Sequence, residues 1–341
     1  MSVRVLKPGL LTTLQDRGRH GHAAFGVGHA GAMDDIAPRL ANALVGNPPN
    51  VPVLEITILG PRLEFKHATT IALTGAEMSA RTGASDFPMW QAIDVEAGTV
   101  LDVGNARRGA RAYLAIGHLI AEAVLGSASA DVNARLGPAL LREDDELRIG
   151  EIPSGAVALG GLEWMRKKPA VDDVGPSIRA VSHSTHWSLD PRPWFDPDTS
   201  HPIRLIEGAH FEALDEDSRT ALFNDEFRIA ADSNRVGFRL EGPRLALAAP
   251  LELVSEPVAF GTLQLPPDGQ PVALMAEHPT IGGYPRIGQI AAIDLPRLAQ
   301  RRPGDAVRFA PIDLADAQTR YLERERELEC LIEAIGERRR R

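Results

Sequence analysis

The residues best suited to chemistry lie in one stretch, 261–289, with the sequence GTLQLPPDGQPVALMAEHPTIGGYPRIGQ. Acid–base and anion-binding groups surround a pair of glycines there: Glu277, Thr280, Gly282, Gly283, Tyr284 and Arg286. Paired glycines permit positive φ and let backbone N–H groups approach a ligand closely. A guanidinium and a phenol beside them supply donors for a carboxylate or phosphate. An ordinary loop with a surface arginine is the alternative, and residue chemistry leaves both open.

Two arginines and one glutamate define the chemistry that this stretch predicts. Arg235 and Arg286 would hold a carboxylate or carboxyphosphate-like group, because guanidinium forks suit planar anions. Glu277 is the candidate general base, since it is the only carboxylate in the glycine loop. Ser233 and Asn234 precede Arg235, and they would either present polar groups to a ligand or cap a β-turn.

A second polar segment, residues 15–21, is too rich in charge and glycine for the interior of an element. Asp16 and Arg19 are therefore loop residues that can bind a ligand or shape the turn by pairing within it. We predict that one cleft gathers the groups of both segments. The catalytic candidates are Glu277, Arg286, Tyr284 and Asp34. The substrate-binding candidates are Gln15, Asp16, Arg19, Ser233, Asn234, Arg235, Thr280, Gly282 and Gly283.

Short alternating runs separated by glycine and proline position these residues, which favours a mainly β fold. Leu263 and Leu265 face Val272–Met275 across Pro-Pro-Asp-Gly, a pattern that predicts a β-hairpin. Strand-like runs are predicted at 53–58, 62–65, 70–73, 91–95, 100–103 and 112–116, a spacing typical of a barrel or sandwich. Helices are predicted at about 35–45, 215–223 and 314–335.

The chain of 341 residues exceeds one comfortable core, so two domains are expected. A turn followed by a strand is predicted at 142–149, and the same short pattern recurs at 303–309. This repeat suggests two related barrels. We assign residues 1–150 to the first barrel, 151–202 to a linker, 203–312 to the second barrel and 313–341 to a C-terminal helix. Trp164, Trp187 and Trp194 would anchor the linker against the domains.

Composition excludes several classes of protein. The formal net charge of −9 argues against a nucleic-acid binder. No apolar stretch approaches the length of a membrane span and no signal peptide is present. The single cysteine, Cys330, fits a reducing cytoplasm. The sequence contains no phosphate-binding P-loop, no G-x-S-x-G nucleophile motif, no metal-ligand spacing among its histidines and no Met-Lys-Met for biotin attachment.

Seven segments occur in an order that resembles the biotin-dependent carboxyltransferase family, which includes the C subunit of 5-oxoprolinase, also called allophanate hydrolase subunit 2 or Kip-inhibitor antagonist. They are 13–21, 31–34, 41–47, 54–57, 73–76, 233–237 and 280–286. The resemblance implies two cyclophilin-like β-barrels and a few helices. It also implies two partners, the Kip-inhibitor-like B-type subunit of the enzyme together with its A-type subunit. With this type of chain they use ATP to cleave 5-oxoproline to glutamate.

The resemblance leaves two alternatives to a role in 5-oxoprolinase. A fused relative is the carboxyltransferase part of urea carboxylase and acts on biotin carried in trans. The other alternative is a non-catalytic protein that binds a Kip-inhibitor-like partner. The family's usual Asn-Asp and Gln-Thr-Thr are replaced here by Ala276-Glu277 and Pro279-Thr280-Ile281, which removes hydrogen-bonding side chains from the loop. We expect the chain to be inactive alone.

Overall fold

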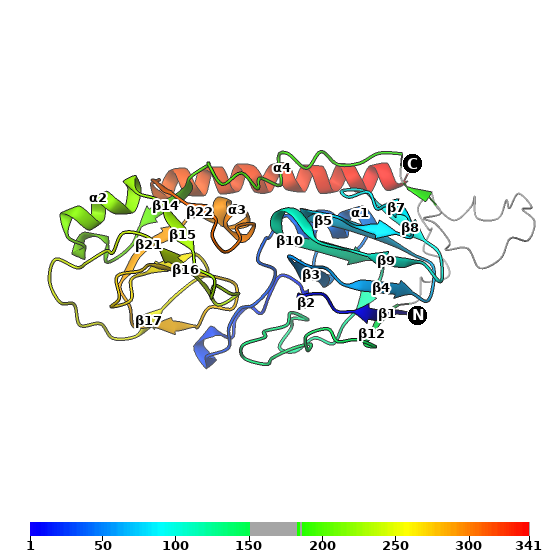
Figure 1. Ribbon diagram of the computed structural model, residues 1–341, viewed down its shortest axis with the longest axis horizontal. Helices are drawn as coiled ribbons and strands as arrows, with labels where there is room; N and C mark the ends of the chain where they lie inside the picture. The colour runs from blue at the N-terminus through cyan, green and yellow to red at the C-terminus, as the bar shows by residue number, and fades with distance from the viewer. Residues whose placement is uncertain (151–182, 185, 341) are drawn as a thin grey trace, which may run out of the picture.

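The computed structural model describes residues 1–150, 183–184 and 186–340. Two β units with separate hydrophobic cores lie side by side, and a long helix runs along both of them (Figure 1). The predicted fold class is confirmed: the chain is mainly β, with two barrel-like units, a few helices and a helix after the second unit.

The first unit packs two sheets around one apolar core. One sheet has the order β11-β12-β1-β4-β9-β6-β7, with β1 Ser2–Lys7, β4 Arg62–Phe65, β6 Arg81–Thr82, β7 Ser85–Asp86, β9 Val100–Asp102, β11 Leu119–Ile120 and β12 Glu146–Ile149. The other has the order β13-β8-β5-β10-β3-β2, with β2 Leu11–Gln15, β3 Val53–Thr57, β5 Thr69–Met78, β8 Ile93–Val95, β10 Ala106–Ile116 and β13 His183–Ser184. The alternation of buried and exposed residues on β1 and β4 turns one face of each strand into the core.

The second unit is built on one eight-stranded sheet of order β22-β15-β16-β19-β18-β21-β14-β23. Its strands are β14 Ile203–Glu207, β15 Phe227–Ile229, β16 Gly237–Glu241, β18 Thr262–Gln264, β19 Val272–Leu274, β21 Arg286–Ile290, β22 Ala306–Val307 and β23 Phe309–Pro311. A small sheet pairs β17 Glu256–Pro257 with β20 Ile281–Gly282. The predicted hairpin is confirmed, because β18 and β19 pair antiparallel across the Pro-Pro-Asp-Gly turn.

The shorter helices begin and end at residues suited to those positions. They are α1 Ala37–Val45, α2 Glu216–Asn224 and α3 Leu295–Ala299, with 3₁₀ turns at Ala23–Phe25, Phe211–Ala213 and Ala292–Asp294. Helix α1 begins two residues later than predicted, with Pro38 in its first turn, where no N–H is needed. It ends at Gly46, whose φ of 79° favours glycine. Asp215 caps α2 by accepting the Ser218 N–H at 2.7 Å.

Helix α4 (Leu314–Arg340) extends along both units in Figure 1 and is longer than the predicted 314–335. Leu328 and Ile335 are buried in a cluster with α1 of the first unit. Arg324 reaches backbone oxygens of the 3₁₀ turn at 292–294 in the second unit. The helix therefore contacts both barrels.

The expected linker, 151–202, is described only from 183 onward and without residue 185, so Trp164 lies outside the described residues. In the described part, Trp187 and Trp194 pack against the cluster that α1 and α4 form. The predicted anchoring by tryptophans is thus confirmed for these two residues. The exact domain boundaries stay a prediction.

Candidate functional site between the two barrels

A buried group of ionisable side chains joins the two units, and we call Glu55, Tyr113, Arg235 and Glu277 the bridge cluster. The Arg235 guanidinium donates from Nε to Glu277 Oε1 at 2.6 Å and pairs through Nη1 with Glu55. Its Nη2 donates to the Gly31 carbonyl at 2.7 Å. One arginine of the second barrel is therefore held by two acceptors of the first barrel and one carboxylate of its own.

The strands of each barrel set the positions of these groups. Glu55 on β3 and Tyr113 on β10 are direct cross-strand partners, which places their side chains on one face. The Tyr113 hydroxyl donates to Glu55 Oε2 at 2.9 Å, and the Met33 N–H donates to the same oxygen at 2.8 Å. In the second barrel, the Glu277 N–H donates to the Arg235 carbonyl at 2.8 Å, which fixes the two loops together.

Burial makes the charges of the bridge cluster depend on one another. Glu55 is 1% exposed, Arg235 3% and Glu277 6%. Burial acts to lower the pKa of Arg235, but the carboxylates of Glu55 and Glu277 more than compensate and raise it above its ordinary value. Glu277 Oε2 also accepts the Asn133 N–H at 3.2 Å. Both Glu277 oxygens are thus engaged, and the role of general base remains a prediction.

Asp34, a catalytic candidate, lies beside this cluster. Its N–H donates to the Tyr113 hydroxyl at 3.0 Å, and its Oδ1 accepts the N–H groups of Ile36 and Ala37. Its Oδ2 accepts a 3.3 Å hydrogen bond from Gln300 of the second barrel. Burial, with a smaller contribution from the charge of Asp35, raises the pKa of Asp34 to about 6. Asp34 is therefore suited to exchanging a proton near neutral pH.

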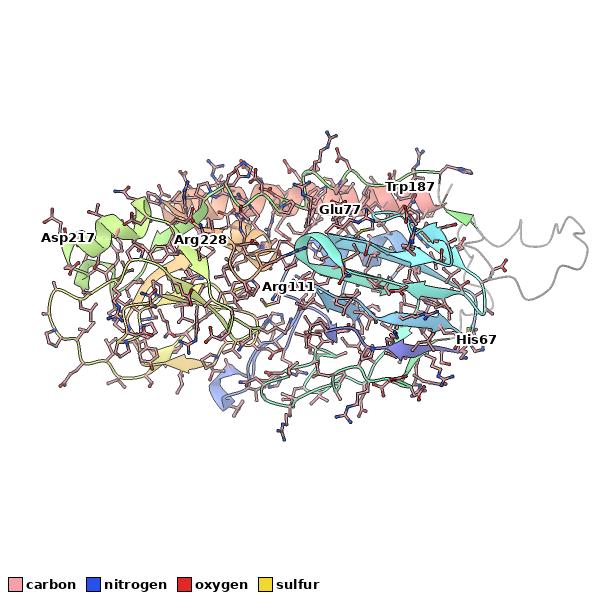
Figure 2. The ribbon with its side chains drawn as sticks, in the orientation of Figure 1. His67, Glu77, Arg111, Trp187, Asp217 and Arg228 are labelled. Carbon is pink, nitrogen blue, oxygen red and sulfur yellow. The ribbon has the colours of Figure 1, made fainter. Side chains whose placement is uncertain are left out.

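Gln300 and Arg111 extend the contact between the barrels, and Arg111 lies at their boundary in Figure 2. Gln300 Oε1 accepts the backbone N–H groups of Ala110 and Arg111 at 3.0 and 2.9 Å. The Arg111 guanidinium bonds the Ala299 carbonyl and lies 5.4 Å from the ring centroid of Phe238. These contacts hold β10 of the first barrel against the second barrel.

A pocket of about 250 Å³, which we call the cleft pocket, opens where both barrels and α4 meet. Its walls include Gln15, Asp16, Arg17 and Asp35 of the first barrel, Phe260 of the second barrel and Tyr321 of α4. Predicted site residues Gln15 and Asp16 therefore share one pocket. The volume suits a ligand smaller than the drug-sized molecules that fill pockets of roughly 300–1,000 Å³.

Asp16, which lines this pocket, and Arg19, which does not, are both held by internal hydrogen bonds. The Asp16 carboxylate accepts hydrogen bonds from the Ser127 and Ser129 hydroxyls at 2.6 and 2.5 Å and from the N–H groups of Gly18 and Ala128. Burial acts to raise the pKa of Asp16, but these hydrogen bonds lower it below its ordinary value, so Asp16 is anionic. Arg19 is 2% exposed and donates to the carbonyls of Val124 and Ser129.

The remaining predicted residues lie in two segments of the second barrel, 233–234 and 280–286. Asn234 Oδ1 accepts the Val236 N–H at 2.8 Å. The Ser233 hydroxyl accepts the Arg239 N–H and donates to the Arg239 carbonyl. Both side chains therefore cap a turn, which is the second of the two roles expected for them. Arg286 begins β21 and pairs with Glu256 of β17. Arg286 and Arg235 thus have different partners, and their sharing of one anion remains a prediction.

The glycine loop differs from expectation in its backbone. Neither Gly282 nor Gly283 has positive φ. A Cβ on Gly282 would come close to Gln264 Nε2, the far end of a flexible side chain that would have to shift. Tyr284 is 48% exposed and Thr280 is half-buried. The loop therefore presents Tyr284 to solvent.

Sequence analysis did not single out Glu55, Tyr113, Arg111 or Gln300 as site residues. Glu55 carried the clearest signal, because it is a carboxylate at the centre of an otherwise apolar strand, Val53–Thr57. Burial of an ionised group without a partner is costly, so such a position calls for a cation from elsewhere in the fold. The strand gives no sign of which cation that is.

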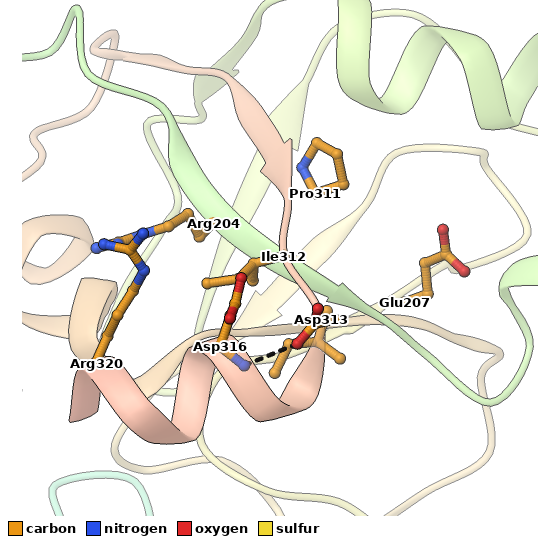
Figure 3. A pocket seen from close by; sticks show the side chains of 8 residues that line it. Arg204, Glu207, Pro311, Ile312, Asp313, Asp316 and Arg320 are labelled. Atoms are coloured by element: carbon orange, nitrogen blue, oxygen red, sulfur yellow. Dashed lines mark hydrogen bonds between the residues drawn. The ribbon is translucent and has the colours of Figure 1, made fainter. Parts of the chain in front are cut away.

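A larger hollow of about 590 Å³ lies beside the start of α4 and is lined by Arg204, Glu207 and Arg320 with several residues of 311–316 (Figure 3). Its Asp313 carboxylate accepts the Asp316 N–H at 2.7 Å. None of the predicted site residues lines it. Among the described residues, no group of three or more His, Cys, Asp and Glu is arranged to hold a metal ion. Within that same part of the chain, no helix has the length and apolar character required to cross a membrane.

Comparison with known proteins agrees with this two-barrel architecture. The family described as "Carboxyltransferase domain, subdomain A and B" matches residues 25–311, and the chain belongs to this family. It is 32% identical to the C subunit of 5-oxoprolinase from Escherichia coli over 333 residues, which cover 94% of this chain and 96% of that protein.

Longer proteins also contain a region similar to this chain. It is 26% identical to urea amidolyase of Saccharomyces cerevisiae over 93% of its own length and 17% of that protein. The crystal structure of the K. lactis urea amidolyase aligns with 98% of this chain at a TM-score of 0.77 and 26% identity. Our chain spans only about a fifth of that crystallised chain, 20%.

Proposed function

We propose that this chain is one subunit of an ATP-dependent 5-oxoprolinase-type complex, which hydrolyses 5-oxoproline or a related lactam to an amino acid such as glutamate. The observation that carries the proposal is its full-length similarity to proteins named as the C subunit of 5-oxoprolinase, at 32% identity over 94% of the chain. The word subunit in that name implies other subunits. We propose that these are homologues of the enzyme's A-type and B-type subunits, the latter Kip-inhibitor-like.

The shape of the inter-barrel site supports a small substrate. The cleft pocket of about 250 Å³ is bordered by buried, pre-positioned polar groups. Arg235, Glu277 and Asp34 lie in the adjoining interface, where Asp34 has a pKa of about 6. In the proposed reaction Asp34 is the group that exchanges a proton near neutral pH, and the bridge cluster keeps the two barrels in register around it.

ATP belongs to the proposal at the level of the complex. The cleft pocket is smaller than the pockets that usually hold drug-sized ligands. The larger hollow is lined by three carboxylates and by two arginines, of which Arg204 is already paired with Asp294, so its net negative charge disfavours phosphates. We therefore propose that partner subunits bind ATP and that the chain acts in the cytoplasm, consistent with its one free cysteine, Cys330.

Reconstitution tests this proposal. The purified chain would be assayed alone and then with the A-type and B-type homologues, and glutamate formation from 5-oxoproline would be followed together with ATP hydrolysis. We expect turnover only in the mixture. Full turnover by the chain alone would show that it does not depend on partners, and no turnover in the complete mixture would refute the proposed reaction.

Carboxyl transfer from biotin carried in trans to urea is the second candidate, favoured by the TM-score of 0.77 to the K. lactis urea amidolyase structure. It predicts an activity that avidin blocks, whereas the 5-oxoprolinase reaction should be insensitive to avidin. The non-catalytic alternative, in which the chain only binds a Kip-inhibitor-like partner, predicts that Arg286→Ala leaves binding intact and that no substrate is turned over.

A further inference from the structure

The side-chain amide of Gln15, at the end of β2, has one unused polar atom. Its Nε2 donates to the Thr13 hydroxyl at 3.1 Å and to the Ala130 carbonyl at 2.9 Å, so both amide hydrogens are used. Because a backbone carbonyl only accepts, the bond to Ala130 fixes which end of the amide is nitrogen. Gln15 is 0% exposed, and its Oε1 has no hydrogen-bond partner among the described residues.

A buried acceptor without a donor carries a desolvation penalty, and most buried polar groups in native proteins have a partner. Gln15 lines the cleft pocket, so a molecule in that pocket can supply the missing donor. The two hydrogen bonds of Nε2, to Thr13 and Ala130, hold the amide in this orientation. The unmet oxygen therefore belongs to a residue of the pocket wall.

The other polar groups of the wall are largely satisfied by the protein. Asp35 pairs with Arg324 at 2.9 Å, and Arg39 pairs with Glu325 at 2.8 Å. Asn42 donates to the Val51 carbonyl at 2.7 Å. These groups are already engaged in holding α4 and α1 in place, so none of them is the primary contact for a ligand.

The two histidines of the wall satisfy each other. His29 Nδ1 bonds the Ala30 carbonyl, and its Nε2 lies 3.1 Å from His20 Nε2. Burial, helped by the proximity of His20, lowers the pKa of His29, which keeps this ring neutral. With Nδ1 carrying the proton, His29 Nε2 accepts and His20 donates.

One cation of the wall remains open. Arg17 is exposed and has no hydrogen bond or ion pair with any residue that the structure describes. The cleft pocket thus combines a buried acceptor with an accessible guanidinium. A ligand that answers both carries an amide N–H and an anionic group, and the guanidinium fork favours a carboxylate.

We propose that Gln15 Oε1 accepts the amide N–H of a small cyclic amide whose carboxylate pairs with Arg17. This inference rests on the proposed function and deepens it, because 5-oxoproline combines a lactam N–H with a carboxylate in one small ring. Gln15 selects for the unsubstituted lactam nitrogen, and Arg17 selects for the acid.

The test uses the reconstituted complex and compares 5-oxoproline with N-methyl-5-oxoproline, which lacks the N–H donor. With the wild-type chain, N-methylation should weaken binding roughly 10- to 100-fold, the loss expected for an unmet buried acceptor. In Gln15→Met, which keeps the length of the side chain and removes the acceptor, the ratio between the two ligands should fall close to one. Gln318→Met, at an exposed position on α4, is the matched control and should keep the wild-type ratio.

Arg17→Met provides an independent variant on the surface. It should raise the KM for 5-oxoproline and leave the weaker binding of 2-pyrrolidinone, a lactam without a carboxylate, unchanged. Thermal unfolding and size-exclusion chromatography would confirm that each variant folds and joins the complex. If Gln15→Met does not fold, the comparison of the two ligands on the wild-type complex still decides the matter.

The outcomes separate this inference from the proposed function. Turnover of 5-oxoproline with equal binding of its N-methyl derivative, or discrimination that persists in Gln15→Met, would overturn the assignment of Gln15 and leave the proposed function standing. If the complex does not hydrolyse 5-oxoproline, calorimetry with the same two ligands measures the pocket directly. An absence of binding in that experiment would overturn the inference together with the function.

Discussion

At the scale of single residues, Arg235 is the centre of the inter-barrel contact. Its guanidinium directly contacts both Glu55 and Glu277, and all three side chains are almost completely buried. A buried ion pair adds little to stability compared with an apolar replacement of the whole group, but removing one partner leaves an uncompensated charge in the interior.

Replacing Arg235 with methionine should therefore destabilise the protein by about 3–5 kcal/mol, because two carboxylates would stay buried without their cation. Chemical denaturation at neutral pH measures this loss. Arg239→Met is the matched control, since that side chain is 54% exposed and its pairing with Asp232 is a surface contact. The control should lose less than about 1 kcal/mol. Equal unfolding midpoints for Arg235→Met and the wild type would contradict the role assigned to the bridge cluster.

Asp34 makes stability depend on pH in the direction opposite to most carboxyl groups. Its folded pKa of about 6 lies above its ordinary value of 3.8, so the folded state holds the proton more tightly than the unfolded chain. Stability is therefore highest below pH 4 for this group and falls as the pH rises toward and past 6. A difference of about 2 in pKa corresponds to a loss of about 3 kcal/mol between those limits.

Asp34→Asn removes this titration and keeps an oxygen for the N–H groups of Ile36 and Ala37. We expect the free energy of unfolding of the wild type, minus that of the variant, to decrease by about 3 kcal/mol between pH 4 and pH 7. Urea unfolding at a series of pH values measures the difference and cancels groups common to both proteins. A difference that does not change with pH would mean that Asp34 titrates normally.

At the scale of elements, α4 holds the first barrel through its apolar side and both units through its arginines. Leu328 is 0% exposed and packs in the cluster with Leu40 and Leu44 of α1. At the same contact between α1 and α4, Arg39 pairs with Glu325, and Asp35 pairs with Arg324. Helix α4 also supplies Tyr321 to the cleft pocket, so its position affects the site.

Leu328→Ala should cost about 2–5 kcal/mol, the range observed when a large buried aliphatic side chain is truncated to leave a cavity. Leu322 is on the same helix and is 52% exposed, so Leu322→Ala is the control and should change stability by no more than about 0.5 kcal/mol. Thermal unfolding of the two variants measures the contrast. Similar losses in both would show that α4 is not packed against α1 in solution.

At the scale of the whole molecule, the two barrels share polar contacts that neither can make alone. Gln300 of the second barrel satisfies two backbone N–H groups of β10, and Arg302 donates to the carbonyls of Ala106 and Gly109. A shift of one barrel against the other that kept these groups out of water would leave them without partners, which carries a desolvation cost for each one. The inter-barrel geometry is therefore fixed, and so is the shape of the cleft pocket.

The sequence was most informative where pattern and period are local. The β18–β19 hairpin followed from alternating leucines around Pro-Pro-Asp-Gly, and α1 was predicted to within two residues at its start. The pairing of Arg235 with Glu277 was expected only as shared membership of one cleft. The pairing of Arg235 with Glu55 joins residues 180 positions apart, and no local rule selects one buried carboxylate for one distant cation.

The order in which a ribosome makes the chain gives α4 a further consequence. Arg39 and Asp35 find their partners 286 and 289 positions later, so the side of α1 that meets α4 stays uncovered through the synthesis of both barrels, although its other side packs on β5 and β10. Domains generally fold as units during synthesis, N-terminal first, and exposed apolar surface makes such intermediates prone to aggregation. A newly folded first barrel would thus expose this apolar surface until α4 emerges to cover it.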